Sequence, residues 1–392
     1  MAGALFEVDA RDGKARAGVL RLAHGEVRTP AFVPLASNAS VRGLGAAEVA
    51  ALGFEMVLGN TFHLFIEPGH AYVAEMGGLH DFMGWRRPII TDSGGFQVFS
   101  MGHGSVAEEI KRRRGAGKSR ILSIEEEGVA FRSYADGSER FMGPETSMQV
   151  QAALGSDIAL AFDECTPFHA DRDYTSRSME RTHRWLDRCT AWHAQHGPEG
   201  QVVFAIVQGG VHEDLRAESS AYAAQAAVDG VAIGGSLGQE KEQMREVVEW
   251  SLRGLPVEKP RHLLGIGDVD DILHGVAAGV DLFDCATPTR LARHGTALVP
   301  DPARRWRLDL KKAPQARGSR EPIEEGCPCP ACRDHTRGYI HYLARRTELT
   351  AARLITLHNL TFMAALMRGL REAIGRGTLA AYRTSVMDGQ AP

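Results

Sequence analysis

Eight short apolar runs, separated by longer segments with helical periodicity, constrain the fold of this chain more than any other feature. Each run ends in polar, small or glycine residues, and the runs are residues 31–36, 56–60, 89–92, 158–163, 202–208, 231–235, 263–267 and 280–284. Residues 144–154, 173–193, 213–228, 241–252 and 269–278 carry apolar residues at three- and four-residue spacing, which is typical of helices. Eight strands alternating with helices predict an α/β fold, a (β/α)8 TIM barrel with insertions.

A doubly wound open sheet is the competing interpretation of the same alternation. That fold more often has a glycine-rich dinucleotide-binding turn after its first strand, whereas residues 35–39 read Leu-Ala-Ser-Asn-Ala. The barrel is therefore favoured. The composition is that of an ordinary globular protein, with 44% apolar and 24% charged residues.

The location of the protein is predicted from its apolar and charged segments. No run approaches about 18 apolar residues, and the amino terminus meets charge too early for a signal peptide, so we expect a cytoplasmic protein with no membrane contact. The net charge of -4 neither suggests nor excludes a polyanionic partner, because such binding depends on local patches. Basic residues do cluster, at 111–120, 304–307 and 311–312.

Three regions are expected along the chain. Residues 1–30 alternate apolar pieces with turn residues, which predicts a small N-terminal antiparallel lid. Residues 31–300 are the expected barrel, with an insertion at about 100–142 that resembles a hairpin with a mobile tip. Residues 301–392 are expected to form a C-terminal zinc-binding subdomain and closing helices.

Polar side chains and glycines follow the predicted strands. Asp92, Asp163, Gln208 and Asp284 each come at the end of an apolar run. Active sites of barrels lie at the carboxyl ends of the strands, so we expect these groups to converge and to hold a polar planar ligand. Asp284 is a candidate nucleophile or base and Arg290 a candidate phosphate contact; the alternative is that Asp284 caps the turn that follows it.

A metal cluster is predicted after the barrel. Its expected ligands are Cys327, Cys329, Cys332 and His358. Three thiolates and an imidazole complete a tetrahedral set with no position left for water, as expected for one structural zinc ion. A disulfide framework, the alternative, suits a large cytoplasmic protein poorly. His335 and His341 lie nearer to the thiols, but His358 on an apolar helical face would bring its helix onto the thiolate loop.

With these residues assembled, the chain resembles the tRNA-guanine transglycosylase family, bacterial type, over nearly its whole length. The resemblance is carried by residues 91–97 (TDSGGFQ), 161–167 (AFDECTP), 207–210 (VQGG), 283–285 (FDC) with 288–290 (PTR), and the thiol cluster with His358. Members of that family exchange the guanine at the first anticodon position of certain tRNAs for 7-aminomethyl-7-deazaguanine (preQ1), a step in making queuosine.

The resemblance implies a retaining double displacement. Asp284 would attack the anomeric carbon of the wobble ribose, expel guanine and hold a covalent ribosyl ester, which the incoming base then displaces. Asp92 would protonate the departing purine or deprotonate the incoming one. Asn60 is expected to orient the nucleophile.

The resemblance also assigns the binding residues. Asp163 would accept from the Watson–Crick edge of the base and Gln208 would donate to its carbonyl; the other base contacts implied are Ser93, Gly94, Gly95, Phe96, Gly235 and Leu264, with Phe96 and Leu264 sandwiching the ring. The implied contacts to the tRNA anticodon stem-loop are Gly265, Ile266, Gly267, Asp268, Val269, Asp270, Asp271, Thr289, Arg290, Leu291, Ala292 and Arg293. The family works as a homodimer.

One loop departs from the family pattern. Many bacterial members follow the paired glycines with a Leu and, after a further Gly, a Glu, whereas residues 236–240 read Ser-Leu-Gly-Gln-Glu. The choice among preQ1, queuine and guanine therefore stays open, although Cys165 is the bacterial-type residue. A zinc-dependent hydrolase barrel is disfavoured because this chain has no His-x-His after its first predicted strand and its plausible metal ligands lie past the eighth. A non-catalytic RNA-binding subunit is disfavoured because both Asp92 and Asp284 are present.

Overall fold

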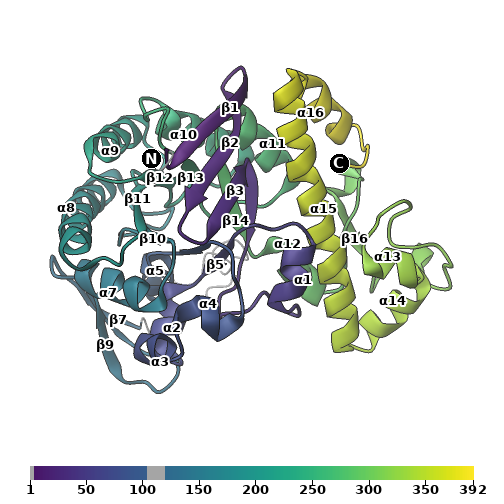
Figure 1. Cartoon of the computed structure of the whole chain (residues 1–392), viewed down its shortest axis with the longest axis horizontal. Helices are drawn as coiled ribbons and strands as arrows, with labels where there is room; N and C mark the ends of the chain where they lie inside the picture. Colours follow the sequence, from purple (N-terminus) through teal and green to yellow (C-terminus); the bar gives the residue numbers. More distant parts are fainter. Residues whose placement is uncertain (1–3, 104–119) are drawn as a thin grey trace.

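A barrel of eight parallel strands forms the centre of the molecule, in a computed structural model that describes residues 4–103 and 120–392 (Figure 1). Around the barrel the strands follow the order β4 (Ala31–Pro34), β14 (Leu282–Cys285), β13 (Arg261–Leu263), β12 (Gly230–Ile233), β11 (Val202–Val207), β10 (Ile158–Leu160), β6 (Ile89–Thr91) and β5 (Val57–Gly59). A parallel bridge between Leu35 and Leu58 brings β4 beside β5, so the sheet nearly closes. The predicted fold class is confirmed.

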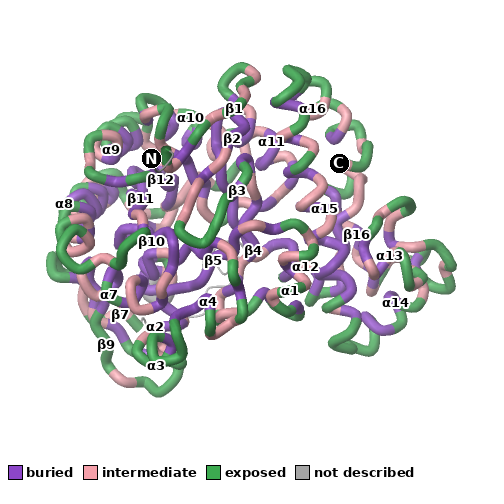
Figure 2. Tube along the Cα trace, viewed as in Figure 1, coloured by how far each residue is buried: buried purple, intermediate pink, exposed green. Residues whose placement is uncertain are grey.

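The strands are buried on both faces, which explains why they read as continuous apolar runs. Seven of the eight strands contribute to one buried cluster, which includes Val33, Leu58, Ile90, Leu160, Ile206, Ala232 and Leu282. A cluster drawn from strands all around the barrel must fill its interior. The alternate residues, such as Val231 and Phe283, pack outward with the helices. Figure 2 shows buried residues concentrated along the barrel.

Helices connect the strands and cover the barrel. They are α1 (Ala46–Ala51), α2 (Thr61–Ile66), α3 (His70–Glu75), α4 (Gly78–Met83), α5 (Gly95–His103), α7 (Pro144–Leu154), α8 (Arg172–His196), α9 (Glu213–Gln225), α10 (Lys241–Leu252), α11 (Val269–Ala278) and α12 (Thr287–Arg293). The predicted bounds of α7, α10 and α11 are confirmed, and two of these helices, α7 and α11, end at a glycine with positive φ. Helix α7, for example, starts with Pro144 and stops at Gly155, whose φ is +70°.

Strand β13 differs from its predicted position. It occupies Arg261–Leu263 rather than residues 263–267. Gly265 has a φ of +74°, which ends the extended conformation. The strand starts earlier than predicted because its first two residues, Arg261 and His262, are polar but buried.

The N-terminal segment is a three-stranded antiparallel sheet. Its strands are β1 (Phe6–Asp12), β2 (Ala15–Leu22) and β3 (Gly25–Thr29). Phe6, Leu20 and Val27 join the interior cluster of the barrel. The buried Arg16 guanidinium donates two hydrogen bonds, of 2.7 and 2.6 Å, to the carboxylate of Asp281, which directly precedes β14. The sheet therefore closes the end of the barrel where the strands begin.

The described part of the insertion, residues 120–142, contains a three-stranded antiparallel sheet rather than a simple hairpin. Strands β7 (Ile121–Ile124), β8 (Val129–Arg132) and β9 (Glu139–Met142) pair in sequence order. These strands pair only with one another and not with the barrel strands, and the expected hairpin is, among residues 120–142, a sheet of three strands. The basic run at 111–118 lies outside the described residues.

The C-terminal region extends beyond the barrel. Strands β15 (Thr296–Leu298) and β16 (Arg307–Asp309) pair, and α13 (Pro330–Asp334), α14 (Arg337–Arg345), α15 (Leu349–Arg376) and α16 (Leu379–Met387) follow. Helix α15 runs alongside the barrel and packs on α12 (Figure 1). By length and composition α15 could cross a membrane, but 61% of its apolar window is buried within the protein. It is therefore best described as a core helix.

Candidate active site and metal centre

The carboxyl ends of β6, β10, β11, β13 and β14 bring polar side chains together, and we call this set the barrel mouth. Asp92 directly follows β6, Asp163 follows β10, Gln208 follows β11 and Asp284 lies within β14. Hydrogen bonds connect residues that follow three of these strands, since Asp163 accepts from both Ser93 and Gln208. The predicted convergence of these residues is therefore observed.

Three donors fix the carboxylate of Asp92. The side-chain amide of Asn60 donates to Oδ2 over 2.5 Å, and the backbone amides of Thr61 and Gly94 donate to Oδ1 over 2.9 and 3.2 Å. Asn60 also caps helix α2 by accepting from the backbone of His63. We expected Asn60 to orient Asp284; instead it holds Asp92, because β5 and β6 are neighbours and place both residues at adjacent strand ends.

Asp163 is buried and held by two side chains. The hydroxyl of Ser93 donates to Oδ1 and the amide of Gln208 donates to Oδ2, each over 2.6 Å. The side-chain oxygen of Gln208, Oε1, is buried without a hydrogen bond to any described residue. Because one amide N–H of Gln208 is engaged with Asp163, its remaining N–H and Oε1 are the groups left for a ligand.

Two glycines let the backbone pass close to these carboxylate and amide groups. A Cβ atom on Gly95 would lie 2.4 Å from the carbonyl oxygen of Asp163 and 2.7 Å from its Oδ1. A Cβ atom on Gly235, whose φ is +77°, would lie 2.2 Å from Oε1 of Gln208. Any larger residue at either position would displace the side chains that form the mouth.

Asp284 faces two nitrogen atoms of β13 and the loop after it. The backbone amide of Gly265 donates to Oδ1 over 3.2 Å. Nε2 of His262 lies 2.9 Å from the same oxygen. His262 was not predicted as a site residue, because a histidine inside a strand gives no sign in the sequence that it borders a carboxylate 22 positions later.

The electrostatics of the mouth favour protonation of Asp92 near neutral pH. Burial raises the pKa of Asp92 from 3.8 to about 7, and the negative charges of Asp284 and Asp163 add to the rise, while the hydrogen bonds from Thr61 and Gly94 oppose it. Burial likewise raises the pKa of Asp163 to about 6, against the hydrogen bonds from Ser93 and Gln208. A carboxyl group with a pKa near 7 can both give and accept a proton at physiological pH.

The remaining predicted base contacts lie around this carboxylate cluster. The side chain of Phe96, on α5, is 47% exposed, an unusual exposure for a large aromatic ring. Leu264 directly follows β13 and is half-buried. Both side chains are therefore partly accessible.

Positive charge lies on helix α12, which follows Asp284. Arg290 and Arg293 are exposed, and Arg42, from the loop after β4, lies near enough to help lower the pKa of Arg293, after the larger effect of burial. Arg42 was not predicted as a site residue. Three arginines from two segments thus form what we call the arginine cluster.

In the other predicted RNA-binding segment, residues 265–271, the acidic side chains already pair with basic side chains of the protein. Asp268 binds Arg305 and Arg307, and Asp270 and Asp271 bind Lys241. Gly265 is exposed and Ile266 half-buried, while Gly267, Val269 and Asp271 are buried, as are Thr289 and Ala292 on α12. The basic side chains that pair with these aspartates reduce the repulsion that they would otherwise exert on a phosphate.

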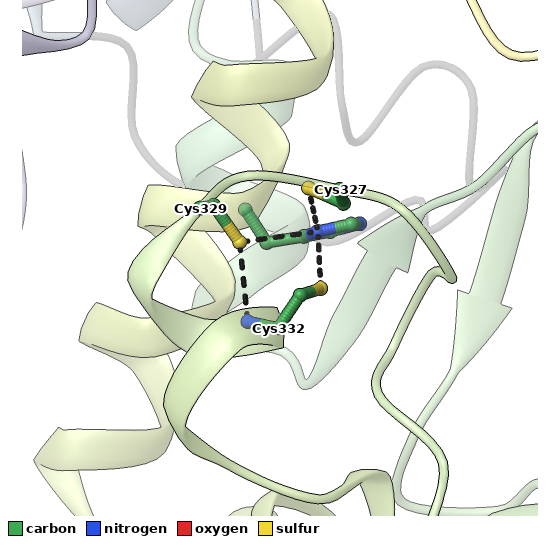
Figure 3. Close-up of side chains that lie close together, drawn as sticks. Cys327, Cys329 and Cys332 are labelled. Carbon is green, nitrogen blue, oxygen red and sulfur yellow. Dashed lines mark hydrogen bonds between the residues drawn. The ribbon is translucent and has the colours of Figure 1, made fainter.

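The predicted metal ligands form one cluster. The thiols of Cys327, Cys329 and Cys332 point toward a common centre (Figure 3), and Nδ1 of His358 lies 3.5, 3.7 and 3.4 Å from their sulfur atoms. Tetrahedral zinc with ordinary Zn–S and Zn–N bonds would separate sulfur from nitrogen by about 3.5 Å. The four residues could therefore hold a metal ion.

The imidazole of His358 is oriented for this task. It is fully buried on α15, and its Nε2 donates to the carbonyl oxygen of Leu298 over 2.7 Å, which leaves Nδ1 free of a proton and facing the thiols. His341, one of the two alternatives, places its Nδ1 against the carbonyl oxygen of Leu310 instead. The preference for His358 among the three histidines is consistent with this geometry.

Comparison with known proteins identifies the family. A family model described as queuine tRNA-ribosyltransferase matches residues 11–392. The queuine tRNA-ribosyltransferase of Roseiflexus sp. (strain RS-1) is 48% identical over 391 residues, covering 96% of this chain and 98% of that protein. The protein of the same name from Pelotomaculum thermopropionicum is 45% identical over 370 residues, covering 94% and 93%. The chain therefore belongs to the queuine tRNA-ribosyltransferase family of transferases.

Proposed function

We propose that this protein exchanges the wobble guanine of queuosine-family tRNAs for preQ1 through a covalent ribosyl ester on Asp284. The observation that carries the proposal is the placement of Asp284 and Asp92 at one barrel mouth, where the charge of Asp284 helps to raise the pKa of Asp92. A nucleophile and a proton-transferring group at one site are the two parts that a double displacement needs.

The first displacement expels guanine. The Asp284 carboxylate attacks C1′ of the wobble ribose, a C1′–O bond forms as the C1′–N9 bond breaks, and the bonding electron pair leaves with guanine. Protonated Asp92 gives its proton to the departing base. A pKa near 7 keeps a large share of Asp92 protonated at neutral pH without making it a poor donor.

The second displacement installs the new base. Ionised Asp92 takes the N9 proton of preQ1, N9 attacks C1′, and the Asp284 carboxylate leaves. Two inversions at one carbon restore the original configuration. Asp92 ends the cycle protonated, as it began.

Asp163 and its neighbours form the proposed base site. The carboxylate of Asp163 accepts from the Watson–Crick edge of the purine, with its position fixed by Ser93 and Gln208. The remaining N–H of the Gln208 amide and the backbone amide of Gly235 serve the base carbonyl. Phe96 and Leu264 enclose the ring from its two faces, while Gly94 and Gly95 allow the ribose to approach the backbone.

The arginine cluster is the proposed contact for the anticodon stem-loop. Arg290 and Arg293 follow the nucleophile by six and nine residues and are exposed on α12. They would bind the phosphates beside the flipped wobble nucleotide, and the exposed part of residues 265–271 would approach the neighbouring bases. Family resemblance supports these assignments together with the exposure of the two arginines.

We assign one structural zinc ion to the cluster of Cys327, Cys329, Cys332 and His358. The sulfur-to-nitrogen separations of 3.4 to 3.7 Å suit tetrahedral zinc. Four protein ligands leave no position for water, so the ion would stabilise the fold rather than take part in the chemistry. We further propose a cytoplasmic homodimer, as in the family.

A base-exchange assay tests the function. The pure protein is incubated with an anticodon hairpin and radiolabelled guanine, with and without preQ1. Guanine should enter the hairpin, and preQ1 should displace it irreversibly. Displacement by queuine alone would correct the choice of base. No exchange of any base would indicate a non-catalytic RNA-binding subunit. Asp284→Asn should abolish the covalent adduct on denaturing gels, and an adduct that persisted would exclude the mechanism.

A further inference from the structure

His262 is a polar residue in the otherwise apolar interior of the barrel. Each of the other seven strands contributes buried hydrophobic side chains to the interior cluster, whereas β13 contributes none to it. The register partners of His262 are Ala232 on β12 and Leu282 on β14, and both belong to that cluster. Register partners direct their side chains to the same face of a sheet, so the imidazole, which is 0% exposed, lies inside the barrel.

The imidazole borders the proposed nucleophile. Asp284 lies two residues after Leu282 and so projects from the same face of β14, one layer nearer the mouth. Nε2 of His262 is 2.9 Å from Oδ1 of Asp284, a hydrogen-bond distance, but neither ring nitrogen makes an aligned hydrogen bond to a described residue. A buried imidazole without a partner is unfavourable, and hydrogen bonds of catalytic groups are often misaligned until the substrate is bound.

We propose that His262 is a positioning residue that determines which oxygen of Asp284 attacks the ribose, an inference that rests on the proposed function. Nε2–H of His262 and the backbone N–H of Gly265 both face Oδ1. When both groups donate in the substrate complex they hold that oxygen, and Oδ2 is left to form the bond to C1′ as the bond to N9 breaks.

The same arrangement assists the second displacement. Once the ester has formed through Oδ2, Oδ1 is its carbonyl oxygen and still faces both donors. When N9 of the incoming base attacks C1′, the electron pair of the C1′–Oδ2 bond returns to the carboxylate. Donors on Oδ1 stabilise that developing charge and so make the carboxylate a better leaving group.

If His262 only packed, substitutions that preserve its volume would leave the rate of adduct formation unchanged. A positioning role predicts a slower reaction in a protein that still folds. Ala232 and Leu282, which flank it, are apolar, so a leucine of similar volume removes a buried polar group without adding one. His262→Leu should therefore fold at least as stably as wild type while its chemistry slows. His262→Gln keeps an N–H donor with a similar reach and should restore much of the rate.

The test compares these two variants with wild type in single-turnover formation of the covalent adduct at saturating anticodon hairpin. His262→Leu should slow adduct formation about 10- to 100-fold, the effect of losing a hydrogen bond to a charged group. Hairpin affinity should change by less than about twofold, because the residue does not touch RNA, and the thermal midpoint should be unchanged or higher. His262→Gln should recover most of the rate.

The inference is overturned if His262→Leu forms the adduct at the wild-type rate, or if His262→Gln is as slow as His262→Leu, since that result indicates packing rather than donation. If His262→Leu does not fold, His262→Met takes its place in the same comparison, because its flexible side chain adapts to the space. A wild-type protein that forms no adduct refutes the proposed function instead, so the two failures are distinguishable.

Discussion

The pH dependence of the two half-reactions is the most direct test of the role of Asp92. Burial first, and the charges of Asp284 and Asp163 after it, raise the pKa of Asp92 from 3.8 to about 7. Adduct formation needs the protonated form, so its rate should be constant at low pH, reach half its maximum near pH 7 and fall about tenfold per pH unit above. Attack of the free base on the adduct needs the ionised form and should show the opposite dependence around the same midpoint.

The raised pKa of Asp92 also makes the stability of the folded protein depend on pH. Because the pKa is higher in the folded chain than in the unfolded chain, the contribution of Asp92 to stability is complete below about pH 3.8 and is lost as the pH rises through about 7. This rise in the pKa of Asp92 corresponds to at most about 4 kcal/mol of stability, and partial exposure of the side chain reduces that figure. Asp92→Ala should therefore gain stability relative to wild type as the pH rises, in urea unfolding.

The kinetic assay separates the two steps. Rapid quenching of the protein with a labelled anticodon hairpin gives adduct formation, and addition of base to preformed adduct gives the second step. Saturating hairpin removes the effect of binding, and a pH range above about 6 avoids protonation of Asp163, whose pKa is raised to about 6. Asp92→Asn, the control, should be slow and independent of pH. Adduct formation that accelerates as the pH rises through 7 would refute the assignment.

Two further predictions concern stability. Arg16→Met removes the ion-pair partner of the buried Asp281 carboxylate, which keeps only the hydrogen bond from the backbone of Arg261, so it should lower the free energy of unfolding in urea by about 3–5 kcal/mol; the double substitution Arg16→Met with Asp281→Leu should recover much of that loss, and a double variant no more stable than the single one would contradict the reasoning. Removal of metal by a chelator should make residues 323–335 sensitive to limited proteolysis while the circular dichroism of the barrel persists, and zinc should restore protection; an equally protected metal-free protein would argue against a structural ion.

The fold could be predicted because its signals are local. Strands buried on both faces appear in the sequence as continuous apolar runs. Helices such as α7 begin at a proline and end at a glycine, and these two residues fix their bounds. Strand β13 was displaced in the prediction because the barrel interior accepts His262 where an apolar residue is expected. The insertion was expected to be a hairpin, and the sheet found among residues 120–142 includes β7, whose mostly half-buried residues give a weak alternation.

The site could be predicted only where a residue stands at the end of its own strand. Asp92, Asp163 and Asp284 satisfy that condition, and their convergence follows from the barrel alone. Contacts between strands depend on register, which the sequence does not state. The partner of Asn60 was therefore predicted incorrectly, and His262 escaped notice, because both are defined by which residue lies beside them on the neighbouring strand.

Helix α15 connects the thiol cluster to the helix that follows the proposed nucleophile. It is about 42 Å long at 1.5 Å per residue, and it carries His358 beside Asn359. The amide of Asn359 donates to the carbonyl oxygen of Pro288 on α12 over 2.9 Å, and its oxygen accepts from the backbone of Leu298. One orientation of α15 about its own axis therefore places His358 beside the thiols and Asn359 against α12, the helix that carries the two arginines. If the thiol cluster holds zinc and the arginine cluster binds the anticodon stem-loop, as proposed, zinc starvation should weaken tRNA binding before it impairs the chemistry at the mouth.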